Sequence, residues 1–123
     1  MARDVCAGYN SLHQTAMTQP QKSRREVLEQ FLLQKPADAF ARYGLALECA
    51  RLGDEPAALS HFQELLAAHP EYVAGYFQYA QFLGRLGRVE EARRLLSEGI
   101  VVAQKAGDRH ARDEMQAALD QLR

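Results

Sequence analysis

The feature that most limits what this chain can fold into is an internal repeat. Pro36 and Pro70 mark the interval between its two copies, and at the same interval the tripeptide Arg51-Leu52-Gly53 recurs unchanged as Arg85-Leu86-Gly87. A period of about 34 residues is typical of stacked helix–turn–helix units, so the sequence predicts a helical repeat architecture. The same shift places similar residues on one another: Tyr43 on Phe77, Ala46 on Ala80, Ala58 on Ala92, Phe62 on Leu96, Glu64 on Glu98 and Leu66 on Ile100.

Each copy contains two stretches whose apolar residues recur with the period of a helix. Gly53 and Gly87 follow the first stretches, at the place where a helix commonly ends in a left-handed residue. Asp54 is placed to cap the next helix, and Pro56 suits its first turn because no intrahelical donor is lost there. The first helices carry Leu45, Ala46, Cys49 and Leu52, then Tyr76, Tyr79, Ala80, Leu83 and Leu86; the second carry Ala58, Leu59, Phe62, Leu65 and Leu66, then Ala92, Leu95, Leu96 and Ile100.

Residues 39–72 and 73–106 resemble two repeats of the tetratricopeptide repeat (TPR) family, and the resemblance is closest to small bacterial members. Three residues depart from the family pattern. Arg42 stands where a large apolar residue is usual, Leu65 is larger than expected, and Gln104 replaces the closing proline, so the last repeat helix is predicted to run on. The residues that match are Leu45, Ala46, Cys49, Ala58, Phe62 and Pro70 in the first copy, and Tyr76, Tyr79, Ala80, Leu83, Ala92, Leu96 and Gly99 in the second.

The segments that flank the repeats predict helices that cover the two ends of the stack. Residues 23–35 read as an N-terminal half-repeat, and residues 109–122 as a C-terminal capping helix. The predicted fold is therefore an all-α solenoid of antiparallel helix pairs over residues 23–123, preceded by a flexible tail at residues 1–22. The apolar stripe of the half-repeat is Val27, Leu28, Phe31 and Leu32, and that of the capping helix is Ala111, Met115, Ala118, Leu119 and Leu122.

Composition and motifs argue against several classes of function. The formal net charge of −1 lacks the large single-sign field typical of nucleic-acid binding proteins. No apolar run approaches the roughly 18 residues of a membrane span, and no secretory signal is recognisable, so we expect a cytoplasmic protein without membrane contact. The cysteines and histidines show no metal-ligand or catalytic spacing, so we expect no enzyme activity, metal or cofactor. These residues are Cys6, Cys49, His13, His61, His69 and His110.

The resemblance implies a binding surface, because ligands of this family often lie in the concave groove lined by the first helix of each repeat. The aromatic and arginine side chains expected there are the types that most often dominate binding energy. Gly44 and Gln78 stand where some relatives carry the asparagines that clamp a C-terminal carboxylate, so no such clamp is expected. Some of the groove residues can instead pack against a neighbouring helix or the tail. The candidate groove residues are Phe40, Tyr43, Leu47, Arg51, Phe77, Gln78, Gln81 and Arg85.

Three functions compete at this level. The leading hypothesis is an adaptor without chemistry of its own, which binds a peptide or helix of a protein partner in the groove. The second is a homodimeric structural protein that self-associates through an end helix or the groove. The third is a nucleic-acid accessory role. It is the least favoured because nearby Glu and Asp residues balance the charge of the basic clusters that would contact nucleic acid. These clusters are Lys22, Arg24 and Arg25, and Arg88, Arg93, Arg94, Arg109 and Arg112.

Overall fold

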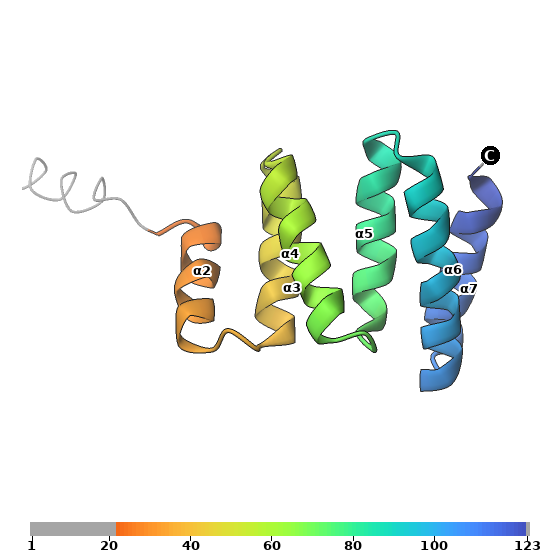
Figure 1. The fold of residues 1–123 in the computed structure, drawn as a ribbon, viewed down its shortest axis with the longest axis horizontal. Helices are drawn as coiled ribbons and strands as arrows, with labels where there is room; N and C mark the ends of the chain where they lie inside the picture. The colour runs from red at the N-terminus through yellow and green to blue at the C-terminus, as the bar shows by residue number, and fades with distance from the viewer. Residues whose placement is uncertain (1–21, 123) are drawn as a thin grey trace, which may run out of the picture.

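The computed structural model describes residues 22–122, which form a single row of helices without strands (Figure 1). Short turns join the helices, so that successive helices run in opposite directions and the predicted all-α solenoid is confirmed. The predicted tail lies outside the described residues apart from Lys22. The helices are α2 (Arg24–Gln34), α3 (Ala39–Arg51), α4 (Glu55–Ala68), α5 (Val73–Arg85), α6 (Val89–Ala106) and α7 (Arg109–Gln121).

The turns between paired helices follow from local sequence. Gly53 and Gly87 both adopt φ 81°, the left-handed conformation predicted for them, which residues with a side chain rarely adopt. The Asp54 side chain accepts a hydrogen bond from the Ala57 amide at 3.3 Å and caps α4, whose first turn contains Pro56. These local signals set the ends of α3, α4 and α5 within about a residue of their predicted places.

The hydrophobic core runs along the whole row and crosses from one repeat to the next. Phe62 of α4 is fully buried and stacks on Tyr79 of α5, with ring centroids 5.0 Å apart. Ala58 and Ala92 are fully buried, so the paired helices can approach closely at these positions. The other buried apolar side chains are Leu32, Ala41, Leu45, Ala46, Cys49, Leu65, Tyr76, Ala80, Phe82, Leu83, Leu96, Ala103 and Met115.

The unusually large Leu65 is accommodated because its neighbour is small. Leu65 is fully buried, and its side chain lies against Gly75, where an added Cβ would be only 2.9 Å from the Leu65 Cδ2. One repeat later the position equivalent to Leu65 is Gly99, which lies against the large side chains of Tyr76 and Met115. A large residue is therefore tolerated at this position where its neighbour is small, and a small residue where its neighbours are large.

The last repeat helix runs on as predicted from the missing proline. Helix α6 continues through Gln104 to Ala106 and ends at Gly107, which adopts φ 73°. As a result the interval from the start of α5 to the start of α7 is two residues longer than the interval from the start of α3 to the start of α5.

The N-terminal helix does not bury its whole predicted stripe. Leu32 is buried and Leu28 packs beside Gly44, but Val27 is 52% exposed and Phe31 is 42% exposed. Phe31 lies one repeat interval before the fully buried Leu65, so α2 leaves exposed a position that α4 buries against Gly75 of α5. Part of the predicted stripe therefore packs inward and part of it stays exposed.

Candidate functional site

The inner groove is the surface along α5 that faces α3 on one side and α7 on the other. Helix α5 contacts both of these helices directly. Two cavities open along the border between α5 and α7. The first, of about 350 Å³, is the Phe77 cavity, lined by Tyr43, Val73, Ala74, Phe77, Gln78, Asp108, His110, Ala111 and Glu114. The second, of about 460 Å³, is the Arg85 cavity, lined by Ala80, Gln81, Gly84, Arg85, Leu96, Ala118, Gln121 and Leu122.

The structure brings together five of the eight residues predicted for the groove. Tyr43, Phe77 and Gln78 line the Phe77 cavity, and Gln81 and Arg85 line the Arg85 cavity. All five lie on one side of the cavities, on α3 and α5.

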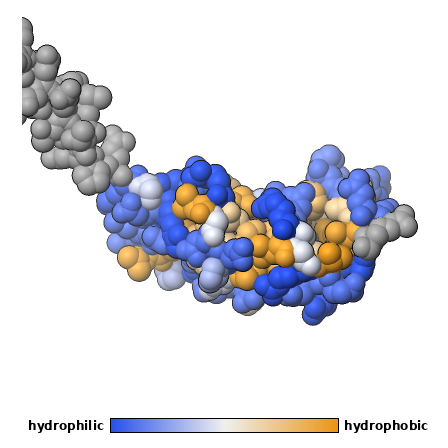
Figure 2. All heavy atoms as spheres, turned by 90° about the horizontal axis from the view of Figure 1, so that it is seen from above, coloured by the Kyte–Doolittle hydropathy of each residue, from blue (hydrophilic) through white to orange (hydrophobic). Residues whose placement is uncertain are grey.

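The other three predicted residues, Phe40, Leu47 and Arg51, line neither of these cavities. Phe40 is 75% exposed at the start of α3, and Leu47 is half-buried against the core. The space-filling view of one face shows hydrophobic patches within a mainly hydrophilic surface (Figure 2).

Tyr43 has a packing role as well as a place in the cavity. Its ring lies 5.4 Å from the Tyr72 ring in a tilted arrangement, and the side chain is half-buried. This burial raises the pKa of Tyr43 above its ordinary value, because the phenolate would lose hydration. The competing expectation, that some groove residues pack against neighbours, thus holds for Tyr43.

Arg51 and Arg85 occupy equivalent positions but differ in what they contact. Arg51 donates hydrogen bonds to both carboxylate oxygens of Glu48, a buried residue that also lies 3.9 Å from the Arg24 guanidinium. These hydrogen bonds hold the pKa of Glu48 below its ordinary value. In the next repeat the residue equivalent to Glu48 is Phe82, and the Arg85 guanidinium carbon lies 5.9 Å from the centre of its ring. Among the described residues Arg85 has no carboxylate partner, so its charge is available.

The opposite side of both cavities belongs to α7, which the sequence identified only as a cap. His110, Ala111 and Glu114 face the Phe77 cavity, and Ala118 and Gln121 face the Arg85 cavity. Helix α7 stands where the first helix of a third repeat would stand. The repeat comparison missed this because the extension of α6 moves α7 out of the register of the two repeats.

The arginines of the predicted basic clusters mostly pair with nearby carboxylates. The Arg25 guanidinium lies 2.9 Å from Asp54, and that of Arg88 lies 2.6 Å from Glu91. These contacts tie α2 to the turn before α4 and brace the start of α6. The other pairs that these clusters make among the described residues are Arg24 with Glu48, Arg25 with Glu29, Arg93 with Glu90 and Arg112 with Asp113.

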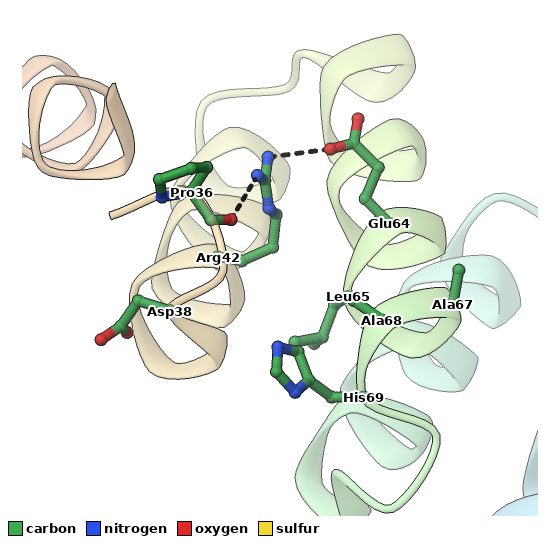
Figure 3. Close-up of a pocket in the computed structure, with 8 residues that line it drawn as sticks. All are labelled: Pro36, Asp38, Arg42, Glu64, Leu65, Ala67, Ala68 and His69. Atoms are coloured by element: carbon green, nitrogen blue, oxygen red, sulfur yellow. Dashed lines mark hydrogen bonds and ion pairs between the residues drawn. The ribbon is translucent and has the colours of Figure 1, made fainter. Parts of the chain in front are cut away.

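A third cavity, of about 390 Å³, lies between α3 and α4 outside the inner groove (Figure 3). Arg42 bridges it, donating to the Pro36 carbonyl at 3.2 Å and pairing with Glu64 at 3.0 Å. In the second copy the Tyr76 hydroxyl donates to the Pro70 carbonyl at 2.6 Å. Arg42 therefore replaces the usual apolar residue while making the equivalent bond, which indicates a structural role.

The described residues contain no group of three or more His, Cys, Asp or Glu side chains that could hold a metal ion. Cys49 is fully buried, and burial raises the pKa of its thiol, as expected for a cysteine that serves as a small apolar residue. Cys6 and His13 lie outside the described part. Between Lys22 and Leu122, no helix has the length and apolar character needed to cross a membrane.

Comparison with known proteins agrees with this architecture. A family model described as tetratricopeptide repeat matches residues 50–119. The TPR repeat-containing protein PA0015 of Pseudomonas aeruginosa is 30% identical over 97 residues, which cover 79% of this chain and 92% of the relative.

Two solved structures have the same fold. The solution structure of a tetratricopeptide repeat domain protein from Salinibacter ruber is 33% identical with a TM-score of 0.68, covering 71% of this chain and 88% of that one. Protein BPP2914 from Bordetella parapertussis is 27% identical with a TM-score of 0.72, covering 83% and 89%. The period, the paired helices and these matches together show that the chain belongs to the tetratricopeptide repeat family.

Proposed function

We propose that this protein is a non-catalytic adaptor that binds a peptide segment of a partner protein in the inner groove. Members of its family generally mediate protein–protein interaction, and this groove offers the means for it. The observation that carries the proposal is the pair of cavities along α5. They combine the half-buried Phe77 ring with the Arg85 guanidinium, which pairs with no carboxylate among residues 22–122. An aromatic ring and an arginine are the side chains that most often supply the largest share of interface energy.

The mechanism rests on a surface that is formed before the partner arrives. Phe77 and Arg85 project from one helix, and α3 and α7 pack against that helix on both sides. Binding therefore costs little ordering of the protein, and more of the contact energy appears as affinity.

Capture of partners from lysate, with the full chain as bait, tests the proposal. The double variant Phe77→Ala, Arg85→Ala is expected to lose at least one protein that the wild type retains. The control is Arg94→Ala, Val101→Ala, which removes an arginine and an apolar side chain from exposed positions of α6 that line neither cavity of the groove. Circular dichroism confirms that both variants fold. Equal recovery of every protein by wild type, variant and control would overturn the proposal.

A second candidate function is self-association through α2. Val27 and Phe31 lie one helical turn apart and are both about half exposed, so a second copy could pack the same row against them. The test is the molar mass of the full chain in solution across a concentration series, measured by light scattering. A dimer that Val27→Glu, Phe31→Glu converts to a monomer would support this function, and a monomer at all concentrations would exclude it.

A further inference from the structure

We propose, resting on the adaptor function, that the inner groove selects a segment with opposite charges at its two ends. A cationic side chain lies at the Phe77 cavity, beside Glu114, and a carboxylate lies at the Arg85 cavity. The stretch of the segment between these two charges runs along α5. The two cavities have opposite charge, and the following contacts explain why.

The Phe77 cavity is the acidic end of the groove. Within the described part of the chain, its lining includes the carboxylates of Asp108 and Glu114 and no Lys or Arg. Asp108 is engaged as the cap of α7, accepting from the Ala111 amide at 3.0 Å. Glu114 is 48% exposed, and its only ionic neighbour between Lys22 and Leu122 is His110, at 3.4 Å. Glu114 is therefore the side chain that can receive a cation from a partner.

The Arg85 cavity is the basic end of the groove. Among the described residues, its lining includes one arginine and no carboxylate. The contact with the Phe82 ring holds the Arg85 guanidinium beside the cavity, and no carboxylate in the described part neutralises it. The equivalent Arg51 pairs with Glu48, whereas Arg85 has Phe82 at the equivalent place and so lacks this carboxylate partner. A carboxylate of the partner, from a side chain or a chain end, would complete this site.

The distance between the two ends fixes the spacing of the charges. Phe77 and Arg85 are eight residues apart on one helix, which is about 12 Å at 1.5 Å per residue. An extended segment covers this distance in about four residues. Helices α5 and α7 are in direct contact, so the groove between them is narrow for a helical ligand about 10–12 Å wide.

The middle of the groove suits the backbone of an extended segment. Gln78 and Gln81 lie between the charged ends, one in each cavity. Neither side chain makes a hydrogen bond to another described residue. Their amide groups can therefore donate to and accept from the peptide groups of a bound segment.

Charge exchange on both sides of the interface tests the proposal. Three probes share a central leucine: Lys-Ser-Leu-Ser-Glu, the same peptide with Lys at both ends, and the same peptide with Glu at both ends. All are acetylated and amidated, so that only side chains carry charge. Binding to the isotope-labelled full chain is followed by NMR titration at low salt.

The wild type is expected to bind the mixed peptide about threefold to fivefold more tightly than either single-sign peptide, as for one exposed ion pair. Arg85→Glu should shift the preference to the Lys-Lys peptide, and Glu114→Lys to the Glu-Glu peptide. Arg94→Glu, on α6, is the matched control and should leave the preference unchanged.

Equal binding of the three peptides, or no binding of any, would overturn the charge proposal. The adaptor function would survive that result if a captured partner still depended on Phe77. If capture showed no such dependence, the adaptor function itself would fail. The two outcomes are thus separated by different measurements.

Discussion

Gly99 is the position where the smallest addition should do the most damage. It lies within α6, where an added Cβ would be 2.5 Å from the Met115 Sδ and 2.7 Å from the Tyr76 Cβ. The Met115 thioether can move, but the Tyr76 Cβ is fixed to the backbone of α5. Gly99→Ala must therefore push α5 and α6 apart, and overpacking of this kind costs about 1–3 kcal/mol.

The chain supplies a matched control for this substitution. Gly84 is also helical, near the end of α5, and an added Cβ there would meet no atom within 4 Å. Both substitutions gain helix propensity, worth at most about 1 kcal/mol. The difference between their free energies of unfolding therefore measures the cost of overpacking at Gly99. Gly84→Ala should equal or exceed the wild type in stability, whereas Gly99→Ala should fall below it.

Urea unfolding followed by circular dichroism measures these changes. Gly99→Ala should be less stable than Gly84→Ala by about 1–3 kcal/mol. Each kcal/mol corresponds to about 4–8 °C in melting temperature for a domain of this size. Equal stability of the two variants would refute the reasoning, because it would mean that α5 and α6 can separate without cost.

Three further substitutions test the packing and the charges. Tyr76→Phe removes the hydrogen bond to the Pro70 carbonyl and should cost about 1 kcal/mol in urea unfolding, whereas no loss would show that water replaces the hydroxyl. Phe62→Ala leaves a cavity in the core and should lower the free energy of unfolding by about 3–5 kcal/mol. A decrease below about 1 kcal/mol would contradict the burial of Phe62. Burial and the nearby Arg42 lower the pKa of His61, so the folded state binds its proton less readily than the unfolded state. Stability should therefore fall as the pH drops below about 6.5, and His61→Gln should reduce that fall; equal losses in both proteins between about pH 7.5 and 5.5 would exclude His61 as the cause.

The sequence predicted those parts of the fold that depend on local signals. The glycine turns, the Asp54 cap and the run-on of α6 past Gln104 could all be predicted, because each is determined by a few adjacent residues. The burial of Phe62 and Cys49 followed from helical periodicity for the same reason.

The rest depends on contacts between distant segments. The place of α7 beside α5 could not be predicted, because a two-residue change in spacing hides the equivalence of Glu114 with groove positions of earlier helices. The difference between Arg51 and Arg85 was missed because both sit in the same tripeptide, and only the residue three positions earlier separates them. The exposure of Phe31 likewise depends on which helix faces it, and periodicity alone does not say this.

The stack of Phe62 on Tyr79 has a consequence for how the molecule unfolds. The two rings belong to different repeats, and each is a large part of the other's surroundings. Unfolding of one repeat would expose to water the aromatic ring of the repeat that stays folded. A chain with only one repeat folded is therefore destabilised at the boundary between the two. In a linear array of repeats, the interaction between neighbouring repeats determines how cooperatively the array unfolds. A strong interaction makes the two repeats unfold together in one transition.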